Sequence, residues 1–354
     1  MSLGASRSRL KTFLQGDNAV SRRMGQPRLQ TRFMEPGDAC GVSRLFRKVY
    51  GFSYPNAVVY DPGRFSRMVS AGEIVSIVTV TGENRVVGHS ALFGEHNGMI
   101  KVGMSLVDSG YRHSECHAGM LGLLVDEGRR RGLSGIWSHV VTDHPYAQKT
   151  GDRAGFKRVA LILGHISAHR EYDGVAENRR KAMAYGFLSL ADHYDGPLYP
   201  PYHHREFIDM IFRNAGLDRR LVQSPGTLHP YGDGQSLIRV RTISADGRAE
   251  VEIRRYSPDT LARTESIVRK LLLKQIDQIT LFLPLSVPLT AVLCEGFEQM
   301  GFFFAGILPR SRIGDALVLQ FLHNKIVDYD RIIVASEMLA QIKAYVRCHD
   351  PNRA

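Results

Sequence analysis

The alternation of hydrophobic and polar positions predicts a mixed order of strands and helices from residue 28 onward. Three runs rich in Val, Ile and Thr are separated by short polar turns, which is typical of an antiparallel meander. Pro62 favours a helix start because a proline at the first helical position costs no hydrogen bond. We expect strands at 29–34, 74–81, 86–93, 99–107, 135–141 and 157–166, and helices at 38–50, 62–71, 117–131 and 145–154.

The second half of the chain follows a polar stretch, residues 171–201, that contains Gly196-Pro197, Pro200 and Pro201. We interpret this stretch as a linker, because proline and glycine interrupt regular structure. Beyond it, Ala245-Asp246-Gly247 is a hairpin signal. We expect strands at 237–243, 249–255, 279–284, 301–308 and 316–322, and helices at 202–215, 258–273, 288–300 and from Asp328 or Asp330 to about Arg347.

Two segments, 136–166 and 279–308, share one order of elements. Each has a strand, a helix that starts at a proline, a Gly-Phe pair and a second strand. The pairs are Gly155-Phe156 and Gly301-Phe302. This order predicts that the second half partly repeats the first.

The composition is that of an ordinary globular protein, with 354 residues, 44% hydrophobic and 23% charged. This length suits two compact units. The four cysteines are far apart, which excludes CxxC zinc sites and argues against a disulfide framework. The chain has neither a long apolar run nor the pattern of a signal peptide, so we expect a cytoplasmic protein without membrane contact.

The net charge of +11 is unevenly distributed. The first 32 residues hold seven basic side chains against one acidic side chain, and residues 1–27 are predicted to be a basic disordered leader. The sequence shows no zinc-finger, RNP or helix-turn-helix pattern, so nucleic acid is not the expected partner. The alternative is a loose electrostatic contact of the leader with RNA or an anionic surface, which salt would weaken steeply.

The order of elements over residues 28–170 resembles the GCN5-related N-acetyltransferase (GNAT) superfamily. The residues that carry this resemblance are Val107-Asp108-Ser109-Gly110-Tyr111-Arg112, Ala147 and Ala154-Gly155-Phe156. It implies an α/β (α+β) fold with a mixed, mostly antiparallel central sheet flanked by helices. After the linker, residues 202–354 are expected to form a second, partial GNAT-like unit.

The resemblance implies an acyl-CoA-dependent N-acyltransferase that uses acetyl-CoA as cosubstrate and acetylates a primary amine of a small molecule or a protein. In this superfamily, backbone N–H groups at a helix start receive the pyrophosphate. Strand amides near Leu106 and Val107 are expected to hold the pantetheine, and Gln148 to contact the cofactor. The pyrophosphate loop corresponds to Arg112, His113, Ser114, Glu115, Cys116 and His117, with a register shifted onto Ala118 and Gly119 as the alternative.

Two features depart from the family pattern. The loop has Glu115 and His117 where the family has small residues, and Gly151 replaces the usual tyrosine proton donor. Tyr146 and His144 are the substitutes that the resemblance suggests for this donor. The candidate bases for the amine are Glu73, Glu95 and His89, and our predicted catalytic set is Tyr146, His144 and Glu73.

These departures also support an alternative function, a non-catalytic tandem acetyltransferase-like protein that serves as a binding or regulatory module. We expect no metal site. Residues 113–117 lie in a predicted turn without a distant ligand partner. His203-His204 is interpreted as a solvated helix start, with a substrate-lining role as the alternative. The sequence leaves the amine and the oligomeric state open.

Overall fold

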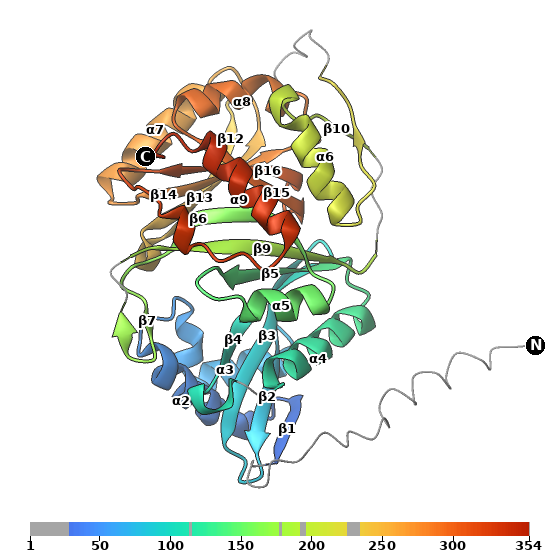
Figure 1. Cartoon of the computed structure of the whole chain (residues 1–354), viewed down its shortest axis with the longest axis vertical. Helices are drawn as coiled ribbons and strands as arrows, with labels where there is room; N and C mark the ends of the chain where they lie inside the picture. Colours follow the sequence, from blue (N-terminus) through green and yellow to red (C-terminus); the bar gives the residue numbers. More distant parts are fainter. Residues whose placement is uncertain (1–27, 113–114, 177–178, 192–195, 225–233, 354) are drawn as a thin grey trace, which may run out of the picture.

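The computed structural model describes residues 28–112, 115–176, 179–191, 196–224 and 234–353. The predicted leader at 1–27 lies outside these residues. Twelve strands form one sheet in the order β1-β2-β3-β4-β5-β9-β6-β15-β16-β14-β13-β12 (Figure 1). Their bounds are β1 (Leu29–Phe33), β2 (Ile74–Thr81), β3 (Val86–His96), β4 (Met99–Val107), β5 (Gly135–Val141), β6 (Lys157–Ile166), β9 (Lys181–Ser189), β12 (Leu237–Ile243), β13 (Arg248–Arg255), β14 (Gln278–Pro284), β15 (Phe303–Ser311) and β16 (Gly314–Leu322).

Helices cover both faces of this sheet. The sequence explains individual helix starts: the Asp61 side chain accepts a hydrogen bond from the backbone N–H of Arg64, and Pro62 occupies the first turn of α3. The bounds are α2 (Ala39–Tyr50), α3 (Pro62–Ser70), α4 (Cys116–Arg130), α5 (Tyr146–Arg153), α6 (Arg205–Asn214), α7 (Thr260–Leu273), α8 (Leu289–Gln299) and α9 (Glu337–His349). Shorter elements are the 3-10 turns η4 (Tyr202–His204) and η6 (Tyr329–Arg331) and the paired strands β7 (Glu171–Tyr172) with β8 (Val175–Ala176) and β10 (Pro197–Leu198) with β11 (Arg220–Leu221).

The sheet contains two series of strands with the same order and directions. In the first series, the β3-β4 hairpin is followed by β5 parallel to β4, and β9 lies antiparallel between β5 and β6. In the second series, the β12-β13 hairpin is followed by β14 parallel to β13, and β16 lies antiparallel between β14 and β15. Figure 1 shows β3 and β4 of the first series in the lower part of the molecule, β5, β9 and β6 across its middle, and the second series in the upper part.

The two series meet where β6 pairs with β15 in antiparallel orientation, at Gly306 opposite Ala160. Gly306 has φ of +136°, and a Cβ atom built there would lie 2.3 Å from the carbonyl oxygen of Val159. Only glycine accepts both this conformation and this close approach. Farther along, the Gln320 side chain accepts a hydrogen bond of 2.8 Å from the backbone N–H of Leu163.

Buried hydrophobic side chains show which helices pack on each face of the sheet. Buried residues of α2 and α3 pack with Val78, Ala91 and Met104 on one face of the first series. Buried residues of α4 pack with Ile100 and Ile136 on the opposite face. A larger core joins β6, β9 and the second series to α6 and α9.

The structure corrects two expectations from the sequence. The predicted linker, residues 171–201, contains β9, which pairs with both β5 and β6 inside the sheet. The last helix begins at Glu337, well after Asp328 and Asp330, because the Ser336 side chain caps it while Asp328 caps only η6. Among the described residues, no helix has the length and apolar character needed to cross a bilayer.

Candidate active site

Strands β4 and β5 are paired only over the first part of their lengths. Their register runs from Met99 opposite Gly135 to Val102 opposite Ser138. Beyond that point β4 pairs with β3, through Leu106 and Val107, while β5 pairs with β9. Within the described residues, the facing edges of the two strands are therefore not joined to each other. This is the position where the family resemblance places the acyl donor.

A bulge in β4 adjoins this opening. Met104 has φ of +51°, and the register between β3 and β4 shifts between His89 and Ala91. The buried His89 side chain fixes the bulge through Nδ1, 2.8 Å from the Met104 carbonyl oxygen, while Nε2 lies 2.8 Å from Ser76 Oγ. Burial lowers the pKa of His89 to about 4. Because both ring nitrogens are engaged, His89 positions the strand and is not available as a base.

Titratable side chains line the sheet face opposite α4. Lys101 is opposite Trp137 on β5, and His139 lies two residues farther along the same face. Both side chains are half-buried. The His139 ring stacks on the Tyr185 ring with centroids 3.6 Å apart and planes within 6°. Tyr185 Oη in turn lies 3.4 Å from Nδ1 of His165.

Burial controls the charges of these groups. It lowers the pKa values of His139 and His165 well below the usual range, with further lowering by nearby cations, so both rings are neutral at pH 7. It also lowers the pKa of Lys101 to about 8. In the part of the chain that the structure describes, His139 Nδ1 is buried and has no hydrogen-bond partner.

The second series contributes charges to the same region. The Arg248 side chain on β13 donates a hydrogen bond of 2.8 Å to Glu250. After burial, Arg248 is the next cause that lowers the pKa of Lys101, and Glu250 opposes this effect. Residues separated by about 150 positions in the sequence thus form one electrostatic environment.

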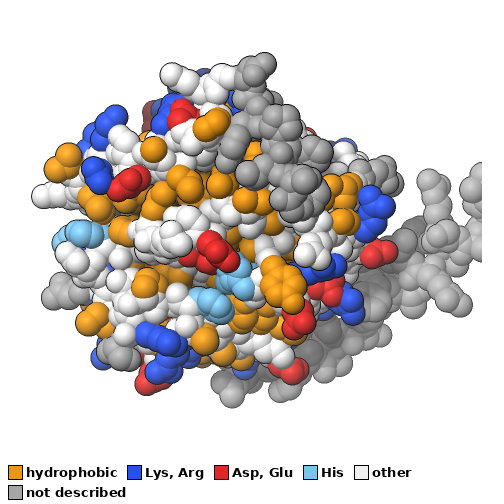
Figure 2. Space-filling view, turned by 90° about the horizontal axis from the view of Figure 1, so that it is seen from above, with side chains coloured by type: hydrophobic (Ala, Val, Ile, Leu, Met, Phe, Trp, Pro, Cys, Tyr) orange, Lys and Arg blue, Asp and Glu red, His pale blue; other side chains and the backbone are white. Residues whose placement is uncertain are grey.

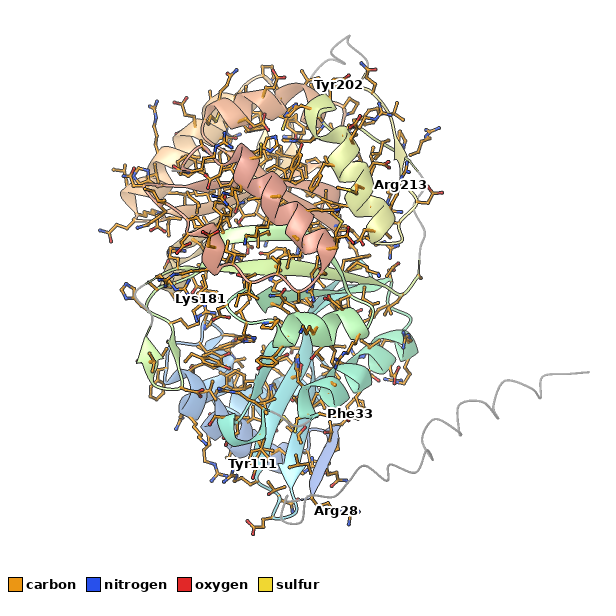
Figure 3. All side chains as sticks on the ribbon, viewed as in Figure 1. Arg28, Phe33, Tyr111, Lys181, Tyr202 and Arg213 are labelled. Carbon is orange, nitrogen blue, oxygen red and sulfur yellow. The ribbon has the colours of Figure 1, made fainter. Side chains whose placement is uncertain are left out.

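The predicted cofactor loop is only partly described, since His113 and Ser114 lie outside the described residues. Arg112 forms an ion pair of 2.5 Å with Asp173 and lies over the Tyr172 ring, and its Nε donates to the Val107 carbonyl. Glu115 is exposed at the start of α4, where its side chain makes no capping hydrogen bond. Figure 3 places Tyr111 beside this region.

The next residues form the first turn of α4. Cys116 is buried, His117 is half-buried, and Ala118 and Gly119 are exposed. Burial, and after it the charge of His144, lowers the pKa of His117. Leu106 is buried and Val107 half-buried in the part of β4 beyond its pairing with β5.

The Gln148 side chain is engaged within the protein. It is fully buried and donates to the backbone carbonyls of Val141, His144 and Ile333. Its side-chain oxygen accepts from the backbone N–H of Ala335. Gln148 therefore ties α5 to the segment that precedes α9, and its contact with a cofactor stays a prediction.

The predicted catalytic residues do not gather at one point. Tyr146 is 68% exposed, and its ring lies 5.7 Å from that of His144. Glu73 is exposed and directly precedes β2. The other end of β2 is the one that lies near Val107, since Thr79 pairs with Gly88 and Gly88 pairs with Val107. Glu95 is half-exposed and lies 3.8 Å from Arg131.

The residues that the structure does bring together are Lys101, His139, His165 and Tyr185. No local motif marks them in the sequence, because they lie within strands whose other residues are mostly apolar. His139 itself is a signal in the sequence, because it is a titratable residue within a short strand that is otherwise mostly hydrophobic. Strand alternation places it on the same face as Trp137.

No protein-family model and no curated protein sequence matches this chain. Several solved structures do match about half of it. The protein yncA from Salmonella typhimurium, solved with its cofactor acetyl-CoA, is 15% identical with a TM-score of 0.39, over 47% of this chain and 96% of that protein. The spermidine/spermine N-acetyltransferase SpeG from Vibrio cholerae is 13% identical with a TM-score of 0.37, over 46% and 95% of the two chains.

The ribosomal-protein-S18-alanine N-acetyltransferase from Escherichia coli is 12% identical with a TM-score of 0.37, over 48% of this chain and 97% of that enzyme. With identities and TM-scores this low, the matches concern fold alone. They cover about half of the chain and do not address the remainder.

Proposed function

We propose that the chain is an acyl-CoA-dependent N-acyltransferase that transfers an acetyl group from acetyl-CoA to a primary amine. The observation that carries this proposal is the end of β4-β5 pairing at Val102 and Ser138, directly beside the half-buried His139. Strand β4 continues past this point, and its edge toward β5 can hold an extended ligand. The ring of His139 has an unpartnered Nδ1 among the described residues.

In this proposal the pantetheine lies along β4 near Leu106 and Val107. The amine nitrogen attacks the thioester carbonyl carbon, so that a C–N bond forms, the C–S bond breaks and coenzyme A leaves as a thiolate. Positioning of the two substrates and backbone N–H groups aimed at the carbonyl oxygen provide most of the acceleration.

We assign the role of base to His139, which is neutral at pH 7 and can take a proton from the amine at Nδ1. His144 and Tyr146 remain the proposed donors of a proton to the departing thiolate. Glu73 has no role in this proposal because β2 places it at the far end of the sheet from Val107.

The test is an assay of thiol release from acetyl-CoA in the presence of a panel of amines: a polyamine, a peptide with a free α-amino group and a lysine-containing peptide. We expect at least one amine to stimulate release. His139→Gln is expected to lower kcat about 100-fold or more. The matched control is His323→Gln, at an exposed histidine beyond β16, which should retain full activity. Equal activity of the His139 variant and the control would contradict the assignment.

A second candidate function is a non-catalytic binding module, and the start of α4 favours it. Under the family resemblance the Glu115 carboxylate would lie close to a phosphate, and Arg112 is already paired with Asp173. Like charges at a helix start would weaken pyrophosphate binding. This candidate predicts that the wild-type chain does not bind acetyl-CoA at millimolar concentration, whereas the enzyme proposal predicts binding.

A further inference from the structure

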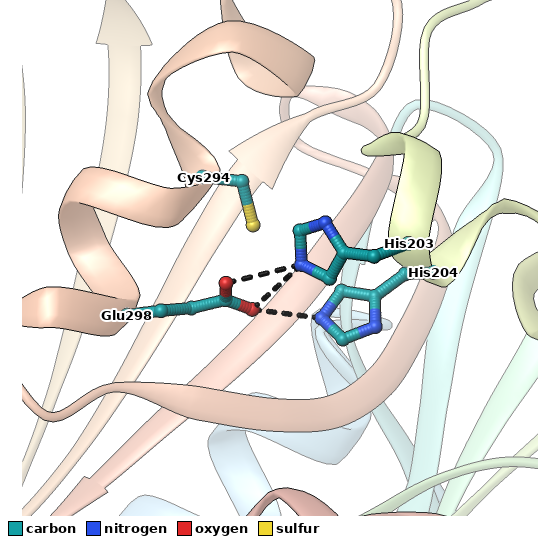
Figure 4. A group of neighbouring side chains, drawn as sticks. All are labelled: His203, His204, Cys294 and Glu298. Carbon is teal, nitrogen blue, oxygen red and sulfur yellow. Dashed lines mark hydrogen bonds and ion pairs between the residues drawn. The ribbon is translucent and has the colours of Figure 1, made fainter.

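A compact cluster of four metal-ligating side chains lies in the upper half of the molecule, away from β4 and β5 (Figures 1 and 4). The residues are His203, His204, Cys294 and Glu298. One ligand atom from each lies within 4.8 Å of the others. We propose that these four residues form a zinc site, independent of acyl transfer.

Two separate segments supply the ligands. Cys294 and Glu298 are four residues apart on α8, so they share one face of this helix. His203 and His204 come from η4, directly before α6. Figure 4 shows both imidazole rings directed at the Glu298 carboxylate, with the Cys294 sulfur on the same side.

One ring nitrogen of each histidine lies within hydrogen-bond distance of the Glu298 carboxylate. Nε2 of His203 lies 3.0 Å from one carboxylate oxygen of Glu298, and Nε2 of His204 lies 2.8 Å from the other. Typical Zn–N, Zn–O and Zn–S bonds imply a tetrahedron with edges of roughly 3.3–3.6 Å. Adjustments of about 1 Å in the side chains would bring the four ligand atoms to such an arrangement.

A second layer of contacts fixes the orientation of His204. Its side chain is fully buried, and Nδ1 lies 2.9 Å from the phenol oxygen of Tyr345 on α9. The Phe304 ring packs against the imidazole with centroids 4.8 Å apart. Nε2 is therefore the nitrogen directed toward Glu298. A hydrogen bond to the other ring nitrogen is typical of zinc-binding histidines.

The donor set suits zinc. Two imidazole nitrogens, one thiolate and one carboxylate are all common zinc ligands, and thiolate disfavours magnesium and calcium. The His203 side chain is 35% exposed, which leaves a route for an ion. Figure 2 shows histidine side chains beside acidic and hydrophobic ones at this end of the molecule.

The proposed ion would fasten η4 and α6 to α8, and through Tyr345 to α9. Residues 196–224 lie between the two series of strands in the sequence, and a metal would hold this segment against the second series. Four protein ligands leave no open coordination position, which is typical of a structural rather than a catalytic zinc.

The first test uses the full chain without a histidine tag, equilibrated with Zn²⁺ and then desalted. Elemental analysis should find about one zinc per chain, and loading should raise the thermal midpoint by roughly 5 °C. Co²⁺ in place of Zn²⁺ should produce visible d–d absorption bands and a thiolate-to-cobalt charge-transfer band in the near ultraviolet.

Variants identify the ligands. Cys294→Ser should abolish the charge-transfer band, while Cys348→Ser, at an exposed cysteine of α9, should retain it. Tyr345→Phe should weaken zinc affinity about 10–100-fold, as expected for a residue that orients a ligand. His203→Gln, at a partly exposed position, should also weaken zinc affinity.

Less than a tenth of an equivalent of bound zinc in the wild-type chain would overturn the proposal and leave a hydrogen-bonded His-Glu-His cluster. Stoichiometric zinc that survives both Cys294→Ser and His203→Gln with unchanged affinity would overturn it as well, because the ion would then be bound elsewhere.

Discussion

The two series of strands have the same connectivity and differ at the end of the strand that precedes the long helix. In the first series, Asp108 follows β4, and its carboxylate binds Lys48 at 2.8 Å, on the side away from α5. In the second series, Tyr256 follows β13, is buried, and lies 2.8 Å from Thr290 in the first turn of α8. The end of β4 is therefore tied to α2, and the end of β13 is tied to α8.

The starts of the following helices differ in the same way. At α7, the Asp259 carboxylate accepts hydrogen bonds from Ser257 Oγ and the backbone N–H of Ser236. Neither Asp259 at α7 nor Glu115 at α4 makes a capping hydrogen bond to its own helix, so the difference lies in these contacts of Asp259. We infer that one architecture can be kept open for a ligand or closed by a few polar contacts, and that only the first series is suited to acetyl-CoA.

The largest effect is expected at the junction of the two series. Gly306→Ala would force a methyl group to within 2.3 Å of the Val159 carbonyl oxygen at a positive φ. We expect a loss of about 3–5 kcal/mol in the free energy of unfolding, measured by chemical denaturation. Gly314→Ala is the control, since φ is +81° and its Cβ meets nothing within 4 Å. Its cost should be about 1–2 kcal/mol, and equal losses would show that close packing at the junction contributes nothing.

The burial of Lys101 on β4 is tested by the pH dependence of stability. Burial lowers the pKa of Lys101 from the usual 10.5 of a lysine to about 8, so the unfolded chain binds more protons between these pH values. The stability of the wild-type chain should therefore rise between about pH 8 and 10.5 from this group. Lys101→Met should be more stable than wild type at pH 7 by up to about 3 kcal/mol, with the advantage vanishing above pH 10.5.

The control for this pH series is Lys149→Met, at an exposed lysine of α5. Its stability relative to wild type should stay constant across the same pH range. A constant difference for Lys101→Met would mean that Lys101 is solvated in the folded chain.

A smaller effect is expected at the hydrogen bond between Tyr256 and Thr290 in the second series. Tyr256→Phe removes the phenol that contacts Thr290, which should lower the free energy of unfolding by about 1 kcal/mol. It should not create a second acetyl-CoA site, because the Asp259 carboxylate remains at the start of α7. Binding of a second equivalent by this variant would show that Tyr256 alone distinguishes the two series.

Much of the fold could be predicted from the sequence. Local signals, such as Pro62 after Asp61 and the run of Val, Ile and Thr in 74–81, specify α3 and β2 almost to the residue. The position of β9 could not be read this way, because it depends on pairing with β5 and β6, which are distant in the sequence. The prolines after it made the whole stretch resemble a linker.

The candidate site was less accessible to sequence reasoning than the fold. The resemblance directed attention to the loop after β4 and to residues at the start of α5. Gln148 there satisfies backbone groups of the distant residues 333 and 335. His139 and Lys101 are brought to the charges of β13 only by tertiary structure, and Cys294 and Glu298 meet His203 and His204 for the same reason.

The most direct test of the account is a calorimetric titration of the chain with acetyl-CoA, in the wild type and in Glu115→Gly. We predict one equivalent bound per chain and a several-fold gain in affinity in the variant, because a carboxylate is removed from the expected pyrophosphate position. Arg112→Ala should weaken binding. No binding by either the wild type or Glu115→Gly, or two equivalents per chain, would contradict the claim that the first series alone is the acetyl-CoA site.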